Sequence, residues 1–256
     1  MINQLRADTY RITHSIGFYI TLLLVISYSV LITESKSIGG IMVNADQSLL
    51  AHLANSNWTI LDSIRGLTMS SSALMYVIMS LFVIIIGYEF SQKTYKNTLV
   101  SGISRFKFIM AKYVMLLFTI FINIFMYFLT VLATSMILGR KLGASWPHLI
   151  NISLVTTLAV LFFISIVFSI AILVLMLTNS IVISSVFIVL FPLAVSMLHV
   201  FVKWNWLKYI DFFGASNKVA VGTLTASHFG PYILTCGIIL VVCIGLSLVT
   251  IKEKEL

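Results

Sequence analysis

The stretch at residues 149–177 reads LINISLVTTLAVLFFISIVFSIAILVLML. No Asp, Glu, Lys or Arg interrupts it. A helix needs about 20 mostly apolar residues to cross the hydrocarbon layer of a bilayer. Residues 149–177 therefore predict a membrane-spanning helix, and the question for the rest of the chain is whether this pattern recurs.

The composition of the 256 residues indicates that it does. Hydrophobic residues make up 60% of the chain and charged residues 9%, whereas a soluble domain is about 45–50% apolar and about 25% charged. A chain this apolar cannot cover a water-facing surface, which excludes a soluble enzyme, a disordered chain and a disulfide scaffold. The net charge of +8 comes from cations clustered between apolar runs, as in membrane loops, so we expect no nucleic-acid partner.

Six apolar runs are long enough to cross a membrane. They lie at residues 16–32, 67–88, 113–138, 149–177, 181–202 and 231–251. We therefore expect an all-α membrane protein with six transmembrane helices. We expect it to form a single transmembrane domain over residues 1–256, with no nucleotide-binding domain.

The distribution of Lys and Arg predicts the orientation of these helices. An even number of spans places both termini on one side of the membrane, and cytoplasmic loops carry an excess of cations. The densest group of cations, Lys93, Lys96, Arg105, Lys107 and Lys112, lies between the second and third runs. We therefore expect both termini and this loop to be cytoplasmic, and residues 33–66 and 203–230 to be external.

Shorter amphipathic segments are expected between the spans. Leu5, Ile12 and Ile16 share one helix face, with Arg6, Asp8 and Arg11 elsewhere, which predicts an N-terminal helix on the inner membrane surface. Residues 47–65 are expected to form an interfacial helix. The aromatic segment 203–230 predicts a short re-entrant or interfacial helical pair, and the few residues between the fourth and fifth runs predict a tight hairpin.

The six runs carry no Asp, Glu, Lys or Arg between their ends. Proteins keep such intramembrane charges for ion coupling, proton relays or catalysis. The chain also lacks a GxxxxGK[ST] phosphate loop, because none of its 13 glycines is followed by Lys. If ATP drives this protein, the hydrolysis must take place on a separate subunit.

The loop after the second run is the most informative segment. It reads YEFSQKTYKNTLVSGISR over residues 88–105. Tyr95, Leu99, Val100 and Ile103 recur at helical spacing. Gly102 is suited to end a short helix, and Ser104 is suited to cap the next one. This pattern predicts a short amphipathic helix beneath the membrane, with a solvated basic loop as the alternative.

Within this loop the order of residues resembles that of permease subunits of ABC-2 type ABC transporters. The matching residues are Glu89, Thr94, Lys96, Leu99, Ile103, Ser104, Arg105 and Lys112. The six spans, the N-terminal amphipathic helix and the tight hairpin agree with that family along nearly the whole chain. The chain departs from the family pattern at Gly102, where many members have Pro.

The resemblance implies an ABC-2, type V exporter-like fold, with transport and ATP hydrolysis on separate subunits. Two permeases, as a homodimer or a paralogous heterodimer, would form the pathway. A separate ABC ATPase would hold ATP and Mg²⁺. This chain would then be a transport subunit without cofactors of its own. The short helix would be the coupling helix that binds the ATPase. The residues implied for this coupling are Glu89, Thr94, Tyr95, Lys96, Asn97, Leu99, Val100, Ser101 and Arg105. On the same resemblance, Glu89 stands at the membrane end of the second run, where a salt bridge to a nearby cation is expected.

The compact size resembles bacterial exporters of amphipathic or antimicrobial peptides, including self-protection systems against lantibiotics and bacitracin and exporters of phenol-soluble modulins. The resemblance implies a multi-pass protein of the bacterial cell membrane, with peptides or hydrophobic drugs as substrates. Side chains expected to line an apolar cavity are Tyr76, Met79, Phe82, Phe187, Phe191 and Met197.

Two other classes of function remain open. A membrane-embedded enzyme or assembly factor would need polar catalytic groups within the spans. An ion-coupled carrier or channel would need buried charge, inverted repeats or a polar stripe along a pore. Neither pattern is evident in the sequence.

Overall fold

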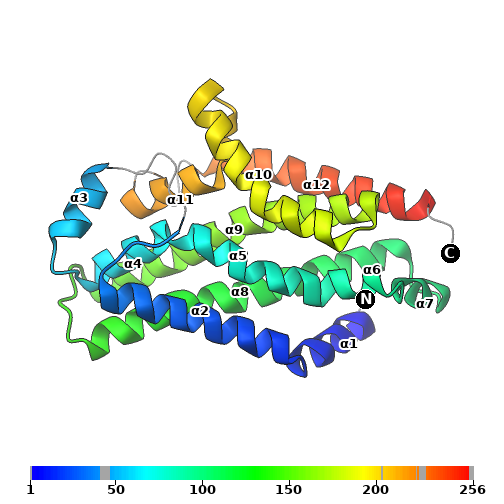
Figure 1. The fold of residues 1–256 in the computed structure, drawn as a ribbon, viewed down its shortest axis with the longest axis horizontal. Coiled ribbons are helices and arrows are strands. Elements are labelled where there is room, and N and C mark those ends of the chain that lie inside the picture. Colours follow the sequence, from blue (N-terminus) through cyan, green and yellow to red (C-terminus); the bar gives the residue numbers. More distant parts are fainter. Residues whose placement is uncertain (1, 41–46, 203, 223, 225–228, 254–256) are drawn as a thin grey trace.

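The computed structural model describes residues 2–40, 47–202, 204–222, 224 and 229–253, and every regular element among them is helical (Figure 1). The elements in chain order are α1 (Ile2–Thr13), α2 (Ile16–Ser35), α3 (Gln47–Asn55), α4 (Ile60–Met69), α5 (Ser71–Phe82), the π-helical turn η1 (Val83–Gly87), α6 (Tyr88–Ser91), α7 (Tyr95–Val100), α8 (Arg105–Ile137), α9 (Trp146–Thr178), α10 (Ile181–Val202), the 3₁₀ turn η2 (Leu207–Tyr209), α11 (Phe212–Val221) and α12 (Gly230–Glu253).

Six helical segments are long and apolar enough to cross a membrane, as the sequence predicted. They are Ile16–Ser35, Ser71–Ser91, Arg105–Ile137, Trp146–Thr178, Ile181–Val202 and Gly230–Ile251. The third begins at Arg105 rather than at residue 113. Apolarity marks only the part of a helix that lipid can cover, whereas the helix itself starts where Ser104 caps it by accepting from the Lys107 amide at 3.4 Å.

The segment before the second span differs from its prediction. Residues 47–65 form two helices rather than one interfacial helix, because Trp58 adopts a positive φ of 23° and Thr59 then starts α4 with a capping box to Asp62. Trp58 is buried rather than exposed to a membrane surface. Ile60, Ile64 and Leu67 are buried, and α4 packs against α8 and α11. The second span therefore starts at Ser71 rather than at residue 67.

The segment after α10 forms short helices, as expected, and α11 enters the bundle. Asp211 caps α11 by accepting from the Gly214 amide at 3.0 Å. Ser216 is buried, and its hydroxyl lies 2.9 Å from that of Ser71 on α5. Parts of the predicted segment, at residues 203, 223 and 225–228, lie outside the described residues. The described part of α11 is a buried helix packed against α4 and α9 rather than a surface helix.

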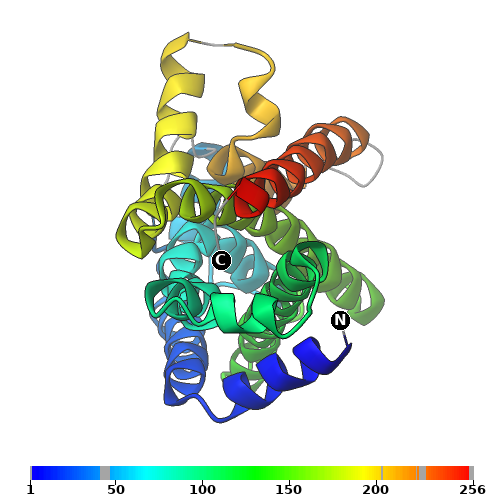
Figure 2. The ribbon, with the colours of Figure 1, turned by 90° about the vertical axis from the view of Figure 1, so that its right-hand side faces the viewer.

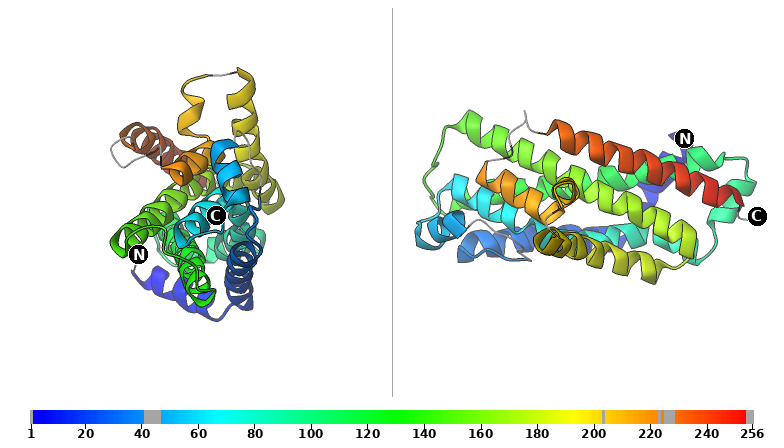
Figure 3. Two further views of the ribbon diagram at one scale, coloured as in Figure 1. Left: turned by 90° about the vertical axis from the view of Figure 1, so that its left-hand side faces the viewer. Right: turned by 90° about the horizontal axis from the view of Figure 1, so that it is seen from above.

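The bundle has two distinct ends. Figures 1 and 3 show that α1, α7 and the last turns of α12 lie at one end, and that α3 lies at the other. The helix α9 lies at the centre and contacts α8, α10 and α12. The C-terminal part of α10 projects from the bundle (Figure 2), and Pro192 inside this helix gives a physical cause for a bend because it removes a backbone hydrogen bond.

Candidate functional site

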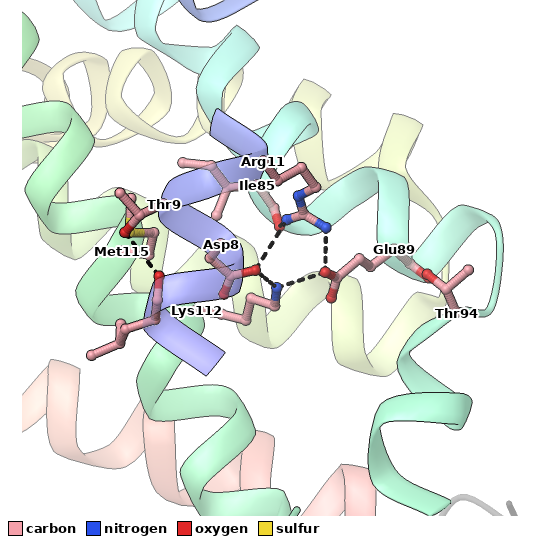
Figure 4. A network of polar contacts seen from close by, with 9 residues as sticks. Asp8, Thr9, Arg11, Ile85, Glu89, Thr94, Lys112 and Met115 are labelled. Carbon is pink, nitrogen blue, oxygen red and sulfur yellow. Dashed lines mark hydrogen bonds and ion pairs between the residues drawn. The ribbon is translucent and has the colours of Figure 1, made fainter. Parts of the chain in front are cut away.

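Four ionisable side chains meet at the end of the bundle that carries α7. Asp8 and Arg11 come from α1, Glu89 from α6 and Lys112 from α8, and Figure 4 shows all four pointing toward one another. Asp8, Glu89 and Lys112 are buried, whereas Arg11 is partly exposed. Two carboxylates and two cations make a cluster without net formal charge.

Lys112 is the centre of this charge cluster. Its Nζ donates to Asp8 Oδ1 and to Glu89 Oε1, each at 2.6 Å. Arg11 donates to Glu89 Oε1 and lies 3.5 Å from Asp8 Oδ1. A buried charge needs a partner with good geometry, since removing one partner typically costs about 3–5 kcal/mol. The cluster therefore ties α1, α6 and α8 together.

A local distortion of the second span completes the cluster. Residues Val83–Gly87 form a π-helical turn in which the Tyr88 amide donates to the Val83 carbonyl. The Ile85 carbonyl accepts from Arg11 Nη2 at 2.8 Å. Single π-helical turns often occur at functional sites. Here the turn offers a backbone acceptor to a side chain from another helix.

The prediction that Asp8 lies away from the apolar face of α1 was wrong, whereas the expected ion pair of Glu89 is confirmed. Asp8 is 2% exposed and shares the buried face of α1 with Ile12. Asp8 comes three residues after Leu5 and four before Ile12, so helical spacing itself places it on their face. Its partner Lys112 lies more than 100 residues away in the chain and could not be identified from the sequence. The spacing of Asp8 and Ile12, one helical turn apart, is the only sequence signal for the contact.

Aromatic rings connect the charge cluster to α7. The Phe90 ring, next to Glu89, stacks on Tyr95 with a centroid distance of 4.5 Å. It also lies 6.3 Å from the ring of Phe108, and Lys112 Nζ is 5.5 Å from the Phe108 centroid. Such ring pairs contribute about 0.5–1.5 kcal/mol beyond their buried area. The short helix α7 is therefore fixed to α6 and α8.

The predicted coupling residues divide between two faces of α7. Tyr95 and Leu99 are buried against the chain itself, and Lys96 is partly exposed. Residues with exposed side chains are Thr94, Asn97, Val100 and Ser101. Val100, at 71% exposure, is the largest apolar side chain on that outer face. Arg105 is partly exposed at the start of α8.

The predicted end of the short helix and the predicted start of the next helix are both confirmed. Gly102 has a φ of +90°, where nothing lies within 4 Å of an added Cβ, and its amide donates to the Leu99 carbonyl. A residue with a side chain is strained at this φ, which gives glycine a structural reason to follow α7. Ser104 then caps α8.

An open groove lies beside α7. Its volume is about 710 Å³, and it runs between the α6–α7 segment and the turn that joins α9 to α10. The lining side chains belong to Phe90, Ser91, Lys93, Tyr95, Lys96, Asn179, Ser180, Ile181 and Val182. The groove thus combines two cations with apolar side chains at the end of the bundle.

The six side chains expected in a substrate cavity have different surroundings in the described part of the chain. Phe82 is fully buried and packs edge-on against Phe168 at 5.9 Å. Phe187 and Phe191 stack on α10 at 4.9 Å, whereas Met197 is 53% exposed. Tyr76 and Met79 are partly exposed on α5. Their role as cavity residues stays a prediction that concerns an assembly of two permeases.

A second polar cluster lies where the C-terminal part of α10 meets α11. Asp211 accepts a hydrogen bond from Ser196 Oγ, and His199 Nδ1 lies 2.9 Å from Asp211 Oδ2. Asp211 and Ser196 are buried, and the His199 side chain is 24% exposed. Because Asp211 also caps α11, this cluster joins α10 to α11.

Neither cluster resembles a metal site. Among the described residues, no group of three or more His, Cys, Asp or Glu side chains is placed to hold a metal ion. In the second cluster the hydroxyl of Ser196 bonds to Asp211 rather than to His199. This cluster therefore lacks the nucleophile–base contact of a hydrolase.

The fold fits the class of multi-pass, all-helical membrane proteins, with a charged and aromatic junction at one end of the bundle. No protein-family model matches the chain, and the search of curated proteins found no match. The functional argument therefore rests on the site itself.

Proposed function

We propose that this chain is the membrane-spanning permease subunit of an ATP-driven ABC exporter. The observation that carries the proposal is α7, a short helix held between two spans with one face buried in the chain and the other exposed. The sequence resemblance to ABC-2 permeases supports the same assignment. In that role the outer face of α7 binds a separate ATPase, which holds ATP and Mg²⁺.

The anchoring of α7 fits this role. A loop that only connects two spans needs no fixed orientation, whereas a helix that transmits motion must move with the spans. Tyr95 stacks on Phe90, and Phe90 adjoins both Glu89 and Phe108. A displacement of α7 would therefore reach α6, α8 and, through Lys112, α1. The groove beside α7 gives the partner additional surface.

The proposed assembly is a homodimer or paralogous heterodimer in the bacterial cell membrane, with α7 and both termini in the cytoplasm. Five cations between Lys93 and Lys112 support this orientation. The proposed substrates are amphipathic or antimicrobial peptides or hydrophobic drugs. The mostly apolar side chains expected to line the pathway, Tyr76, Met79, Phe82, Phe187, Phe191 and Met197, support this class of substrate.

The buried charge cluster favours one competing function, an ion-coupled carrier. Such carriers use intramembrane carboxylates near the midplane of the bilayer. Asp8 and Glu89, however, lie at one end of the bundle and are paired with cations. Their pairing and position suit a structural junction better than a proton-binding site.

Co-purification and activity measurements test the proposal together. We expect the tagged chain, extracted from its native membrane, to retain a protein with a phosphate loop, and the purified chain alone to hydrolyse no ATP. Reconstitution with that ATPase should give ATP-dependent peptide export. Export driven by a proton gradient without ATP, and abolished by Glu89→Gln, would instead favour the carrier.

A further inference from the structure

An apolar groove of about 630 Å³ lies between α8, α9 and α12. None of its lining residues belongs to α7 or to the polar clusters, although Tyr113 directly follows Lys112. The groove is lined by Tyr113, Leu117, Val155, Leu158, Ala159, Leu161, Phe162, Ser165, Phe229, Ile233 and Leu240. Protein interiors are close-packed, and voids much larger than a water molecule are few. An apolar groove of this size is therefore a candidate binding site.

The groove extends over about half of the membrane. Its wall on α9 runs from Val155 to Ser165, a rise of about 15 Å at 1.5 Å per residue. The hydrocarbon core of a bilayer is about 30 Å thick. Phe229 and Ile233 place one end of the groove at the start of α12, which is the end of that helix away from α7. Tyr113 and Leu117 place its other end in the first turns of the third span, directly after Lys112 of the charge cluster.

The side chains that line the groove are suited to bind a hydrocarbon chain. Its two hydroxyl groups are already engaged within the chain, because Tyr113 Oη donates to the Ser165 carbonyl at 3.5 Å and Ser165 Oγ donates to the Phe162 carbonyl at 2.7 Å. Both hydroxyls therefore donate their proton within the chain, and a ligand that needs a hydrogen-bond donor finds none in them. Apolar cavities also stay dry, so water is not a suitable occupant.

We infer that this groove binds one acyl chain of a phospholipid from the surrounding bilayer. At this depth the medium around the protein consists of acyl chains. Leu158 and Ile233, each 56% exposed, stand on opposite helices at the rim and leave the groove accessible from that medium. The bound chain fills the space between α9 and α12. This inference does not depend on the proposed transport function.

Native mass spectrometry of the full chain, purified from membranes of defined phospholipid composition, tests the inference. Val155→Phe and Ile233→Phe fill the groove from α9 and from α12. Val241→Phe and Ile150→Phe are matched controls, since both residues are exposed on the same two helices outside the groove. We expect the wild type and controls to keep one phospholipid through delipidating washes, and the groove variants to keep at least tenfold less.

A second measurement uses the unmodified protein and so does not depend on how the variants fold. A phospholipid with a photoreactive group in its acyl chain should label peptides that contain residues 155–165 and 229–240. Equal lipid retention by groove and control variants, or labelling spread evenly over all six spans, would overturn the inference. So would groove variants that lose a dimer or a bound peptide while they keep the phospholipid.

Discussion

The charged end of the bundle and the pair α10 and α12 are held in different ways. At the charged end, four ionisable groups and a row of aromatic rings join α1, α6, α7 and α8. In α10 and α12, only 28% and 17% of the residues in the most apolar window are buried, compared with 67% in α9. One region is fixed by specific partners, whereas the other leaves long apolar faces open.

This difference indicates which parts move together. A displacement at the charged end would have to move α1, α6, α7 and α8 as one unit, because separating them would leave buried charges without partners. The open faces of α10 and α12 carry no such constraint and are available to lipid or to a second permease. In the proposed exporter, the fixed region receives the motion of the ATPase, and the open faces meet the partner subunit.

Loss of Lys112 should give the largest effect. Lys112→Met keeps much of the side-chain volume but leaves Asp8 with only the partly exposed Arg11 as a cation. We expect a loss of about 3–5 kcal/mol in the free energy of unfolding, the cost of breaking a buried ion pair. Denaturant unfolding in detergent measures it. Lys107→Met, at an exposed position on the same helix, should change stability by no more than about 0.5 kcal/mol.

Breaking the second cluster, formed by Ser196, His199 and Asp211, should lower the free energy of unfolding by less. Asp211→Ala removes the cap of α11 and the partner of Ser196, while His199 stays partly exposed to solvent. We expect a loss of about 1–2 kcal/mol, typical of a removed N-cap. Asn205→Ala, at an exposed position, is the control. A loss as large as that of Lys112→Met would mean that the two clusters constrain the bundle equally.

A truncation on the open face should have the smallest effect. Val249 on α12 is 53% exposed, so Val249→Ala should change the stability of the isolated chain by no more than about 0.5 kcal/mol. Ile124→Ala, at a fully buried position on α8, should cost about 2–5 kcal/mol. If Val249→Ala lowered the stability of the assembled protein by more than about 1 kcal/mol but left that of the isolated chain unchanged, a second subunit would cover this face of α12.

Orientation can be tested separately with single cysteines in a background without Cys236 and Cys243. Ala54, Asn97 and Asn205 are exposed, and Asn97 lies on α7. With α7 in the cytoplasm, we expect an impermeant thiol reagent to label Ala54→Cys and Asn205→Cys in intact cells, and Asn97→Cys only after lysis. Ser216 is unsuitable as a site because it is buried. Labelling of Asn97→Cys alone would reverse the orientation.

The sequence was sufficient for the features that depend on local chemistry. Runs of apolar residues located the six spans, Gly102 and Ser104 located the end of α7 and the start of α8, and the position of Glu89 at a span end indicated an ion pair. Each of these follows from composition or from neighbours within a few residues.

Features that depend on distant contacts were missed. The spacing of Asp8 puts it on the face of Leu5 and Ile12, but its partner Lys112 could not be identified from the sequence. Residues 60–69 looked amphipathic, but α8 and α11 bury both sides of α4. The π-helical turn at Val83–Gly87 has no local signal in an otherwise regular apolar run. Burial by helices far away in the chain cannot be read from periodicity alone.

The surface of α7 gives the most direct test of the proposed coupling to an ATPase. Leu99 is unsuitable because it is buried within the chain, so a charge there would disrupt α7 itself. Val100 is exposed, and Val100→Asp should leave the fold unchanged while it places a charge in an apolar contact. Thr13→Asp, exposed on α1 at the same end of the bundle, is the control.

The decisive measurement is recovery of the ATPase with each variant, together with peptide export in the same membranes. A contact weakened by about 3 kcal/mol lowers association more than a hundredfold, because about 1.4 kcal/mol corresponds to a factor of ten. We predict a loss of that size in recovery and in export for Val100→Asp, with unchanged thermal stability, and normal values for Thr13→Asp. Equal recovery and equal export for the two variants would contradict coupling through α7.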